Sequence, residues 1–301
     1  MPDDRLRFGV LGAAWIADKA ILDALHAAGN AEVVAIASRD RGRAEAMARR
    51  HAVPAVRDTY DALLDDDGID AVYIGLVNSA HREWTLRALS AGKHVLCEKP
   101  LALSAAEARE MAVAAAAADR ILMEAFMYRF HPQMVQLRQS VDDVRHLSAS
   151  FSFRLTDPGN VRLQPALGGG ALYDIGCYTL DVARWFLGEP HTVQALLSGE
   201  PVDMTVSTLL GFDGDRQTTT WASFDAPEHQ ELVLVERDRV RHITQPFTSW
   251  RDPHDPYQLM IEAFSRAVLN SEPAPRSLED SIGTAELIDR VRAASATRVP
   301  A

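Results

Sequence analysis

The first strand-to-helix junction of this chain reads Gly9-Val10-Leu11-Gly12-Ala13-Ala14-Trp15-Ile16-Ala17. A bound dinucleotide needs a tight turn at such a junction, close approach of the backbone to its pyrophosphate, and free amide groups at a helix N-terminus. Gly12 supplies the turn, whereas Ala14 and Ala17 stand where the usual fingerprint has its second and third glycines. Small residues after a strand also serve packing alone, so the meaning of this stretch depends on the pattern around it.

Around this junction, short apolar runs alternate with stretches of helical periodicity as far as residue 125. Strands are expected at residues 7–11, 32–38, 54–56, 71–76, 94–97 and 121–125, and helices at 14–28, 41–51, 81–91 and 104–118. Alternation of this kind implies right-handed crossovers and a parallel sheet that is covered on both faces. We therefore predict an α/β, doubly wound dinucleotide-binding (Rossmann) domain over residues 1–122.

The pattern changes after residue 125. Apolar residues alternate with Ser148, Ser150 and Ser152 along residues 147–155, which predicts a strand with two different faces. Further strands are expected at residues 204–212 and 216–224, joined by an Asp-Gly-Asp hairpin turn, and at 231–236 and 240–244; helices are expected at 173–187, 257–270 and 277–294. We predict an α+β domain with a large, mostly antiparallel sheet over residues 123–301. Its serine-bearing face is a candidate contact between subunits.

The composition of the 301 residues is that of a globular protein with about two domains. The net charge of −11 argues against nucleic acid and membrane partners, because an acidic surface repels phosphate backbones and anionic lipid. The two cysteines, Cys97 and Cys177, lie in apolar surroundings without metal-ligand spacing, so we expect buried thiols and no metal. Residues 1–7 are charged and no run approaches a membrane span, which predicts a cytoplasmic protein.

The end of the second predicted strand bears on the choice of cofactor. An NAD site places an acidic residue there for the ribose hydroxyls, but this strand ends in Ser38 and Arg39. Arg39 can pair with a 2′-phosphate, Ser38 can donate a hydrogen bond to it, and Arg43 lies one turn further on. Asp40 suits helix capping better than ribose binding. We predict NADP(H), with NAD as the alternative, although a solvated arginine at a helix start would give the same pattern.

Two further loops follow strands of the predicted parallel sheet, at the edge where such sheets bind ligands. Asn78 is placed to hydrogen-bond the cofactor or to cap the next helix, and His81 to orient that loop. In the second loop, Glu98-Lys99-Pro100, a strand delivers a lysine to the position where substrate would meet nicotinamide. A lysine there is costly unless it is paired or used, and the proline restricts its direction.

These motifs together resemble the glucose–fructose oxidoreductase/inositol dehydrogenase (Gfo/Idh/MocA) family. The resemblance rests on the Asn78 and Lys99 loops, on Glu124-Ala125-Phe126-Met127-Tyr128-Arg129-Phe130-His131-Pro132, and on Gly168-Gly169-Gly170-Ala171-Leu172-Tyr173-Asp174-Ile175-Gly176-Cys177-Tyr178. It implies a Rossmann domain followed by a sheet domain, and a catalytic Lys99, often with a cis peptide before the proline. The pattern is similar to members of the dimeric dihydrodiol dehydrogenase type, which implies that Tyr178 is the acid/base, with Asp174 one turn earlier. Inositol-type members carry a histidine near this point, and this sequence does not.

The chemistry of alcohol oxidation is consistent with these residues, because a base must take the hydroxyl proton while hydride leaves carbon for the nicotinamide. A tyrosine has an unperturbed pKa of about 10, and a neighbouring Lys99 ammonium would favour its phenolate. Lys99 itself is the alternative base, since a desolvated lysine also titrates low. Tyr178 could also be a core residue of an apolar helix, in which case it would take no part.

The sequence therefore predicts an NADP-dependent dehydrogenase or reductase that acts on a sugar, polyol or related diol, as a homodimer or larger oligomer. A catalytically silent NADP-binding sensor is the alternative. The candidate cofactor-binding residues are Gly9, Gly12, Ala13, Ala14, Trp15, Ile16, Ser38, Arg39, Arg43, Leu76, Asn78, His81, Glu98 and Lys99, and the candidate catalytic residues are Lys99, Tyr178 and Asp174. Substrate specificity is expected in the loop at residues 155–168, where Arg162 and Gln164 are candidates for substrate contact.

Overall fold

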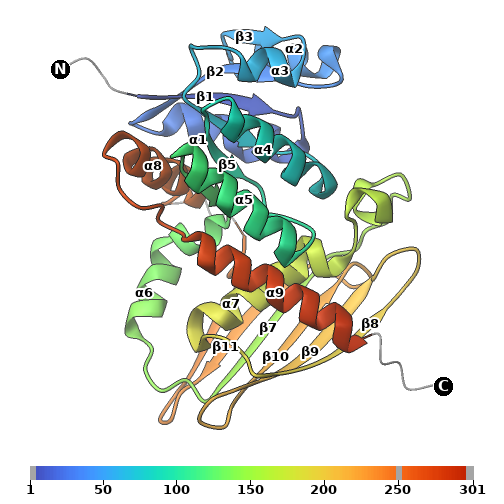
Figure 1. The fold of residues 1–301 in the computed structure, drawn as a ribbon. Helices are drawn as coiled ribbons and strands as arrows, with labels where there is room; N and C mark the ends of the chain where they lie inside the picture. The colour runs from blue at the N-terminus through green and yellow to red at the C-terminus, as the bar shows by residue number, and fades with distance from the viewer. Residues whose placement is uncertain (1–4, 249–252, 296–301) are drawn as a thin grey trace. The chain divides into compact units, whose positions relative to one another are not determined.

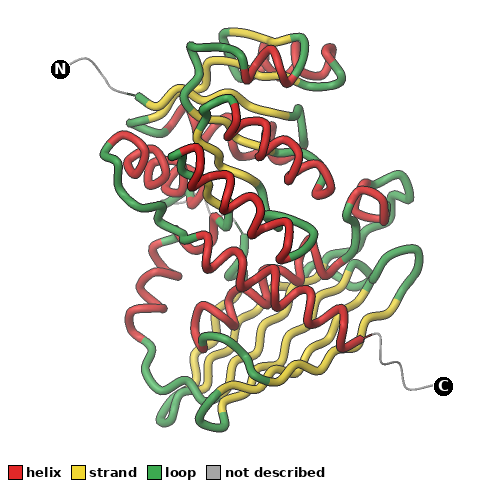
Figure 2. The backbone as a smooth tube through the Cα atoms, in the orientation of Figure 1, coloured by secondary structure: helices red, strands yellow, loops and turns green. Residues whose placement is uncertain are grey.

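A computed structural model describes residues 5–248 and 253–295 of the chain (Figures 1 and 2). Residues 1–4, part of the charged start on which the cytoplasmic prediction rests, lie outside the described residues. The chain groups into two compact units, which are described separately below. The first takes in residues up to 102, 106–131 and the segment that ends at 281, and the second takes in 103–105, 132–248 and the chain from 282 onward.

The first unit contains a six-stranded parallel sheet with strand order β3-β2-β1-β4-β5-β6. The strands are β1 Leu6–Leu11, β2 Ala31–Ala37, β3 Ala55–Arg57, β4 Ala71–Ile74, β5 His94–Cys97 and β6 Leu122–Glu124. The helices of this unit are α1 Leu22–Ala27, α2 Arg41–Arg50, α3 Tyr60–Leu64, α4 His81–Ser90, α5 Ala105–Ala118 and α8 Pro256–Leu269. The doubly wound fold predicted from the alternation is confirmed, and each predicted strand lies within two residues of an observed one.

Helices cover both faces of this sheet, as the middle of β1 illustrates. Consecutive side chains of a strand point to opposite faces. The ring of Phe8 packs 5.8 Å from that of Phe264 in α8. On the other face, a Cβ at Gly9 would lie 2.5 Å from Leu63 of α3. A helix from near the end of the chain therefore completes the first unit, which a division at residue 122 does not anticipate.

The helix expected at residues 14–28 begins in an unusual form. Residues Ala17–Ile21 form a π-helical turn (η1) before α1 continues to Ala27. Such turns are rare in proteins and often lie at functional sites. This one directly follows the turn that the sequence assigns to the pyrophosphate.

The second unit contains a six-stranded sheet with strand order β12-β11-β7-β10-β9-β8, whose side-by-side strands are visible in Figure 2. The strands are β7 His146–Ser152, β8 Thr192–Ser198, β9 Thr205–Phe212, β10 Arg216–Ser223, β11 His229–Val235 and β12 Val240–Thr244. Neighbouring strands are antiparallel except for β7 and β10, which pair in parallel. The predicted mostly antiparallel sheet is thus confirmed, and β8 is an edge strand that the prediction lacked.

Helix α7 (Cys177–Leu187) packs on β7 and β10, while α6 (Pro132–Ser140) and most of α9 (Leu278–Ser295) also belong to this unit. The other face of the sheet exposes apolar side chains, with Leu196 68% and Leu209 40% exposed. Of the three serines that marked this face, Ser148 and Ser150 are half-buried. Ser152 is buried and donates to the Pro227 carbonyl oxygen at 2.7 Å, so that it serves local structure.

Helices α7 and α9 are joined by a polar network whose members are buried except for Glu189. Arg184 donates to Thr284 Oγ1 (2.9 Å) and to Glu189 (3.0 Å), and Thr284 donates to Asp181 (3.0 Å). Gly283 is the residue of α9 that lies against the Arg184 guanidinium, and a Cβ added there would overlap with it. The network therefore needs a glycine at this point of the helix.

We expect Gly283→Ala to lower the free energy of unfolding by about 1–3 kcal/mol, the usual cost of overpacking a filled interior. Gly42→Ala is the matched control, because Gly42 is exposed on α2 and its new Cβ would make an ordinary contact of 3.4 Å. Alanine favours helix over glycine, so the control should be neutral or slightly stabilising. Denaturant unfolding of both variants measures the difference, and equal stabilities would contradict the close contact at Gly283.

Candidate functional site

Except for Gly9, which lies within β1, the candidate cofactor residues of the first unit follow the carboxyl ends of four neighbouring strands. In the order of the sheet these are β2, β1, β4 and β5. The chain order reverses between β1 and β4, since β2 and β3 lie beyond β1 on one side and β5 and β6 lie beyond β4 on the other. In open parallel sheets, ligands bind beyond the carboxyl ends of the strands at such a switch point. The structure thus brings the predicted residues to one edge of one sheet.

Gly12 forms the turn at the end of β1. Its φ is +101°, and a Cβ would lie 2.7 Å from the Gly75 carbonyl oxygen and 2.9 Å from a methyl carbon of Leu76. Its amide donates to the Ala37 carbonyl at 2.8 Å. A side chain at residue 12 would therefore be both strained and obstructed, and the loops after β1 and β4 are in close contact here.

The other residues of the junction have different surroundings. Gly9 lies within β1, where its lack of a side chain makes room for Leu63 and Ile69, so its place is explained by packing. The Ala13 carbonyl accepts a hydrogen bond from Arg43 at 2.7 Å. Trp15 is 66% exposed. Ala14 and Ile16 are half-buried beside it.

In the turn after β2, the neighbouring charged residues Arg39 and Asp40 have different surroundings. Asp40 is the N-cap of α2, and its carboxylate accepts the Arg43 amide at 3.0 Å, as predicted from the sequence. Ser38 Oγ accepts the Asp40 amide at 3.2 Å. Arg39 is exposed. The carboxylate of this turn is thus engaged with the helix, whereas a hydroxyl and a guanidinium lie at the end of the strand.

His81 connects the loop after β4 to the loop after β5. Asn78 begins the short helix η2 (Asn78–Ala80), and His81 begins α4. The imidazole is completely buried, with Nδ1 2.8 Å from the Pro100 carbonyl oxygen and Nε2 3.2 Å from that of Leu76. Burial lowers the pKa of His81, which favours the neutral ring. Its observed role is to fix the two loops relative to one another.

The loop after β5 is held by buried side chains. The Lys99–Pro100 peptide is cis, as the resemblance implies. Glu98 is 8% exposed, accepts a hydrogen bond from the Tyr73 hydroxyl at 2.7 Å, and accepts the Lys99 amide at 3.3 Å. Burial, followed by the charge of Glu98, raises the pKa of Tyr73, so this phenol acts as a donor. Lys99 itself is half-buried.

Glu124, at the end of β6, holds the peptide group between Pro100 and Leu101 in place. Its Oε1 accepts the Leu101 amide at 2.8 Å, and its Oε2 pairs with Arg276 at 3.1 Å. Both side chains of this ion pair are buried, being 2% and 1% exposed. The guanidinium also lies 4.7 Å above the ring of Phe126. Removing one member would leave a buried charge, which costs roughly 3–5 kcal/mol.

The sequence patterns indicated no roles for Tyr73, Glu124 and Arg276. Tyr73 and Glu124 are polar side chains in otherwise apolar strands, and this is a signal that could have identified them. Arg276 lies 152 residues beyond its partner, in a proline-containing connection without any pattern. His81 holds the Pro100 carbonyl and Glu124 holds the Leu101 amide. Arg276 pairs with Glu124, and Tyr73 donates to Glu98.

In the second unit, Asp174 and Tyr178 lie where a π-helical turn meets α7. The turn, η6, covers Leu172–Gly176. Tyr178 is 7% exposed, and its ring centroid lies 5.6 Å from those of Phe151 and Phe247. These two phenylalanines are stacked on one another at 5.7 Å. The phenol ring thus packs against an apolar wall.

Asp174 pairs with Arg162, whose Nε lies 2.6 Å from Oδ2. Arg162 belongs to the loop that was expected to carry specificity, and it is fastened by the glycines that precede η6. Its carbonyl accepts the Gly170 amide at 2.9 Å. A Cβ at Gly169 would lie 2.5 Å from the same carbonyl oxygen. Gln164 is exposed and donates to the Gly159 carbonyl at 3.3 Å.

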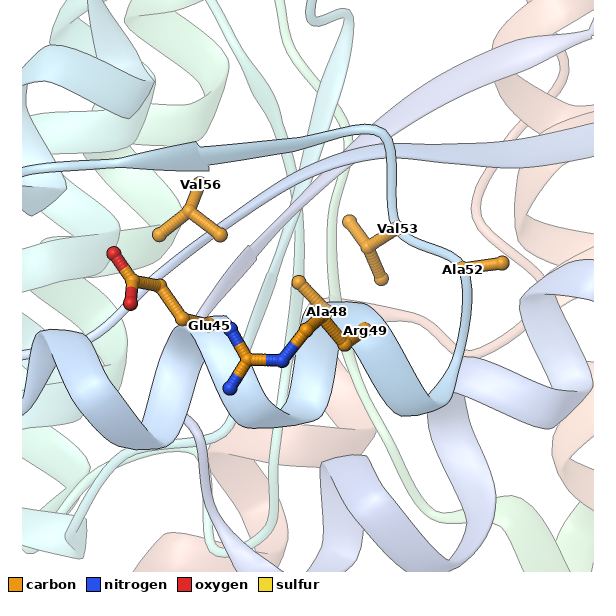
Figure 3. A pocket seen from close by; sticks show the side chains of 6 residues that line it. All are labelled: Glu45, Ala48, Arg49, Ala52, Val53 and Val56. Atoms are coloured by element: carbon orange, nitrogen blue, oxygen red, sulfur yellow. The ribbon is translucent and has the colours of Figure 1, made fainter.

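A hollow of about 430 Å³ lies between α2 and β3, lined by Glu45, Ala48, Arg49, Ala52, Val53 and Val56 (Figure 3). It contains none of the predicted site residues. Within residues 5–248 and 253–295, no group of three or more histidine, cysteine or carboxylate side chains could hold a metal ion. No helix in that part of the chain is both long enough and apolar enough to cross a membrane. Cys97 and Cys177 are buried thiols, as predicted.

Two family models match the chain. Residues 6–126 match the oxidoreductase family GFO_IDH_MocA with an NAD-binding Rossmann fold, and residues 135–242 match the GFO/IDH/MocA C-terminal domain. The chain is 37% identical over 319 residues to a D-xylose 1-dehydrogenase (NADP(+)) of Haloferax volcanii, covering 95% of this chain and 96% of that protein. It is 40% identical over 196 residues to a trans-1,2-dihydrobenzene-1,2-diol dehydrogenase of Xenopus laevis, covering 62% and 59%.

Among solved structures, the chain is similar to a 3-ketoreductase from Actinomadura kijaniata in complex with NADP and TDP-benzene. The TM-score is 0.86 at 32% identity, and the match covers 96% of this chain and 98% of the reductase. The same reductase has been solved with a lysine replaced by alanine or glutamate and with a tyrosine replaced by phenylalanine.

Proposed function

We propose that this chain, which belongs to the GFO/IDH/MocA family of oxidoreductases, transfers hydride between NADP(H) and a hydroxyl or keto group of a sugar, polyol or related diol. One observation supports the proposal most directly. The Gly12 turn and the Glu98-Lys99-Pro100 loop both lie at the carboxyl edge of the same parallel sheet, after β1 and β5. The names of the relatives, a D-xylose dehydrogenase, a dihydrobenzenediol dehydrogenase and a 3-ketoreductase, support the substrate class.

The residues at this edge fit a dinucleotide. Gly12 allows the tight turn at the end of β1, directly before the start of a helix, and a pyrophosphate needs such a turn together with free amides at a helix start. Ser38 and Arg39 would hold the 2′-phosphate, and Leu76, Asn78 and Glu98 would border the nicotinamide riboside. When bound, the nicotinamide supplies or accepts the hydride.

The proton of the reaction needs a separate group. In the oxidation direction, the phenolate of Tyr178 would take the hydroxyl proton, and in the reduction direction Tyr178 would return it while the Lys99 ammonium polarises the carbonyl. Lys99 as the base is the alternative. The solved variants of the related ketoreductase replace the same two residue types, which supports this pair as the reacting groups.

Arg39→Ala is expected to weaken NADP(H) binding selectively. An arginine–phosphate hydrogen bond contributes roughly 1.5–3 kcal/mol, which corresponds to a loss of about ten- to a hundredfold. Binding of NAD(H) should change little, because NAD lacks the 2′-phosphate. Arg49→Ala, which removes the same charge from another exposed position of this region, is the control. Titration calorimetry with both cofactors measures the four affinities, and equal affinity of the unaltered protein for NADP(H) and NAD(H) would contradict the assignment.

The proposed function itself is tested by steady-state turnover. Nicotinamide absorbance is followed with a panel of aldoses, polyols, dihydrodiols and ketosugars, with NADP and NAD in parallel. Turnover with NADP on at least one class is expected. A protein that binds NADP(H) tightly and turns over none of the panel would favour the silent sensor.

We also propose a cytoplasmic homodimer or larger oligomer. The open face of the second unit's sheet supports the assembly into oligomers, because Leu196, Leu209 and Val240 are large apolar side chains that are 40–68% exposed there. Sedimentation analysis of the protein and of a Leu196→Lys variant tests the assembly. A monomer at micromolar concentration would contradict it.

A further inference from the structure

Arg162 is a charged residue of the second unit that pairs with Asp174 and has no part in the proposed mechanism. We propose that it is a positioning residue of the proton-transfer site, whose guanidinium, held by Asp174, stabilises the ionised form of Tyr178. This inference rests on the proposed function for its meaning, but it concerns a property of the resting protein. It differs from the proposal that Lys99 alone favours the phenolate.

The position of Arg162 is fixed on both its backbone and its side chain. Its amide donates to Asn160 Oδ1 at 3.0 Å, and its carbonyl accepts the Gly170 amide at 2.9 Å. Gly169 has no room for a side chain beside that carbonyl. The Nε–Oδ2 distance of 2.6 Å to Asp174 is that of a strong charged hydrogen bond. These contacts together hold the Arg162 guanidinium at a defined point.

That point lies over the ring of Phe153, which neighbours Phe151 of the wall on which Tyr178 packs. The Arg162 guanidinium is 5.9 Å from the ring centroid of Phe153, Phe153 is 6.4 Å from Phe151, and Phe151 is 5.6 Å from Tyr178. Asp174 connects the same guanidinium to the helical turn before Tyr178. The charge of Asp174, and to a smaller extent that of Tyr178, raises the pKa of Arg162. The attraction is mutual, so the cation also favours the phenolate.

Among the described residues of this unit, the strands on which the helix of Tyr178 packs contribute mostly uncharged side chains. Helix α7 packs on β7 and β10, and the buried positions of these strands are apolar or hydroxyl-bearing: Leu147, Ala149, Ser152, Thr218, Thr220, Ala222 and Ser223. On α7 itself, Asp181 and Arg184 are engaged with Thr284 and Glu189. Within the described part of this unit, the charged groups that we assign to the Tyr178 cluster are therefore Arg162 and Asp174.

Because the two charges have opposite signs, their removal should shift the ionisation of Tyr178 in opposite directions. Arg162→Gln removes a cation and leaves the Asp174 carboxylate, so ionisation should occur at higher pH. Asp174→Asn removes an anion and leaves the guanidinium, so ionisation should occur at lower pH. If the two variants acted only by loosening the loop, both would shift the ionisation of Tyr178 in the same direction. The pair of variants therefore separates an electrostatic role from a structural one.

The experiment is an NMR titration of the resting, full-length protein labelled at the tyrosine Cζ carbon. The chain has six tyrosines, and Tyr178→Phe identifies the signal of interest. We expect Tyr178 to ionise below the free tyrosine value, Arg162→Gln to raise its midpoint by about one pH unit, and Asp174→Asn to lower it. Arg162→Lys should lie nearer to the unaltered protein, since it keeps the charge. Arg154→Gln, an exposed arginine of the same loop, should not shift it.

An unchanged midpoint in Arg162→Gln, shifts in the same direction for the Arg162→Gln and Asp174→Asn variants, or a Tyr178 midpoint at or above the free value in the unaltered protein would overturn the inference. No substrate or cofactor is present in this titration. A protein without turnover but with the expected opposite shifts would therefore refute the proposed function and leave the role of Arg162 standing. Turnover without these shifts would do the reverse.

Discussion

Replacing Lys99 with alanine is expected to lower kcat and kcat/KM together, by roughly 10²–10³-fold, the usual cost of removing a group that stabilises charge in the transition state. Lys99 follows a buried strand and precedes a proline, and buried side chains fix the peptide groups on both sides of that proline. The Lys99 ammonium is thus attached to a turn whose backbone is held in place. Affinity for NADP(H) should change little, because the residues assigned to its phosphates lie on other loops.

Steady-state kinetics measures kcat and kcat/KM, and calorimetry measures the affinity for NADPH. Lys19→Ala is the control, since it removes the same charge from an exposed position of the first unit. A Lys99→Ala variant that keeps more than about a tenth of the original kcat would show that the lysine does not act in the transition state. A variant that loses cofactor binding to the same degree would instead assign Lys99 to binding.

The sequence was most informative where local pattern and tertiary structure agree. All six strands of the parallel sheet were predicted because each is a short apolar run between helical stretches, and a buried parallel strand has this pattern. Strand β8 was not predicted, since it lies at the sheet edge and mixes exposed polar with exposed apolar residues. Helix α3 has only five residues, too few for a periodic signal.

Long-range packing accounts for the remaining differences. Helix α8 was predicted as a helix, but its place on β1 depends on contacts such as Phe8–Phe264, between residues that are far apart in the sequence. The same holds for the residues around the Lys99 loop. The motif around Lys99 was visible from its strand and its proline, whereas the Glu124–Arg276 pair that supports it joins two distant segments. Sequence patterns therefore indicate the residues assigned to chemistry more readily than the residues that fix their geometry.

Tyr178→Phe is expected to lower turnover by about 10²–10⁴-fold, the usual contribution of general acid–base catalysis. The substitution removes one hydroxyl and keeps the ring, so the packing against Phe151 and Phe247 should persist. Tyr173→Phe is the matched control. Its hydroxyl donates to the Leu103 carbonyl at 2.7 Å and also contacts Arg292, so that variant should lose stability rather than acid–base chemistry.

The pH dependence distinguishes Tyr178 from Lys99 as the proton acceptor. If Tyr178 is the base, kcat/KM for oxidation rises with pH through the ionisation of its phenol, because the phenolate is the active form, and this ionisation lies below the free tyrosine value of about 10. In Tyr178→Phe the ionisation should vanish from the profile along with most of the rate. A phenylalanine variant with nearly the original rate and the same profile would mean that Tyr178 is a packing residue and that Lys99 takes the proton, since a desolvated lysine can titrate in the same range.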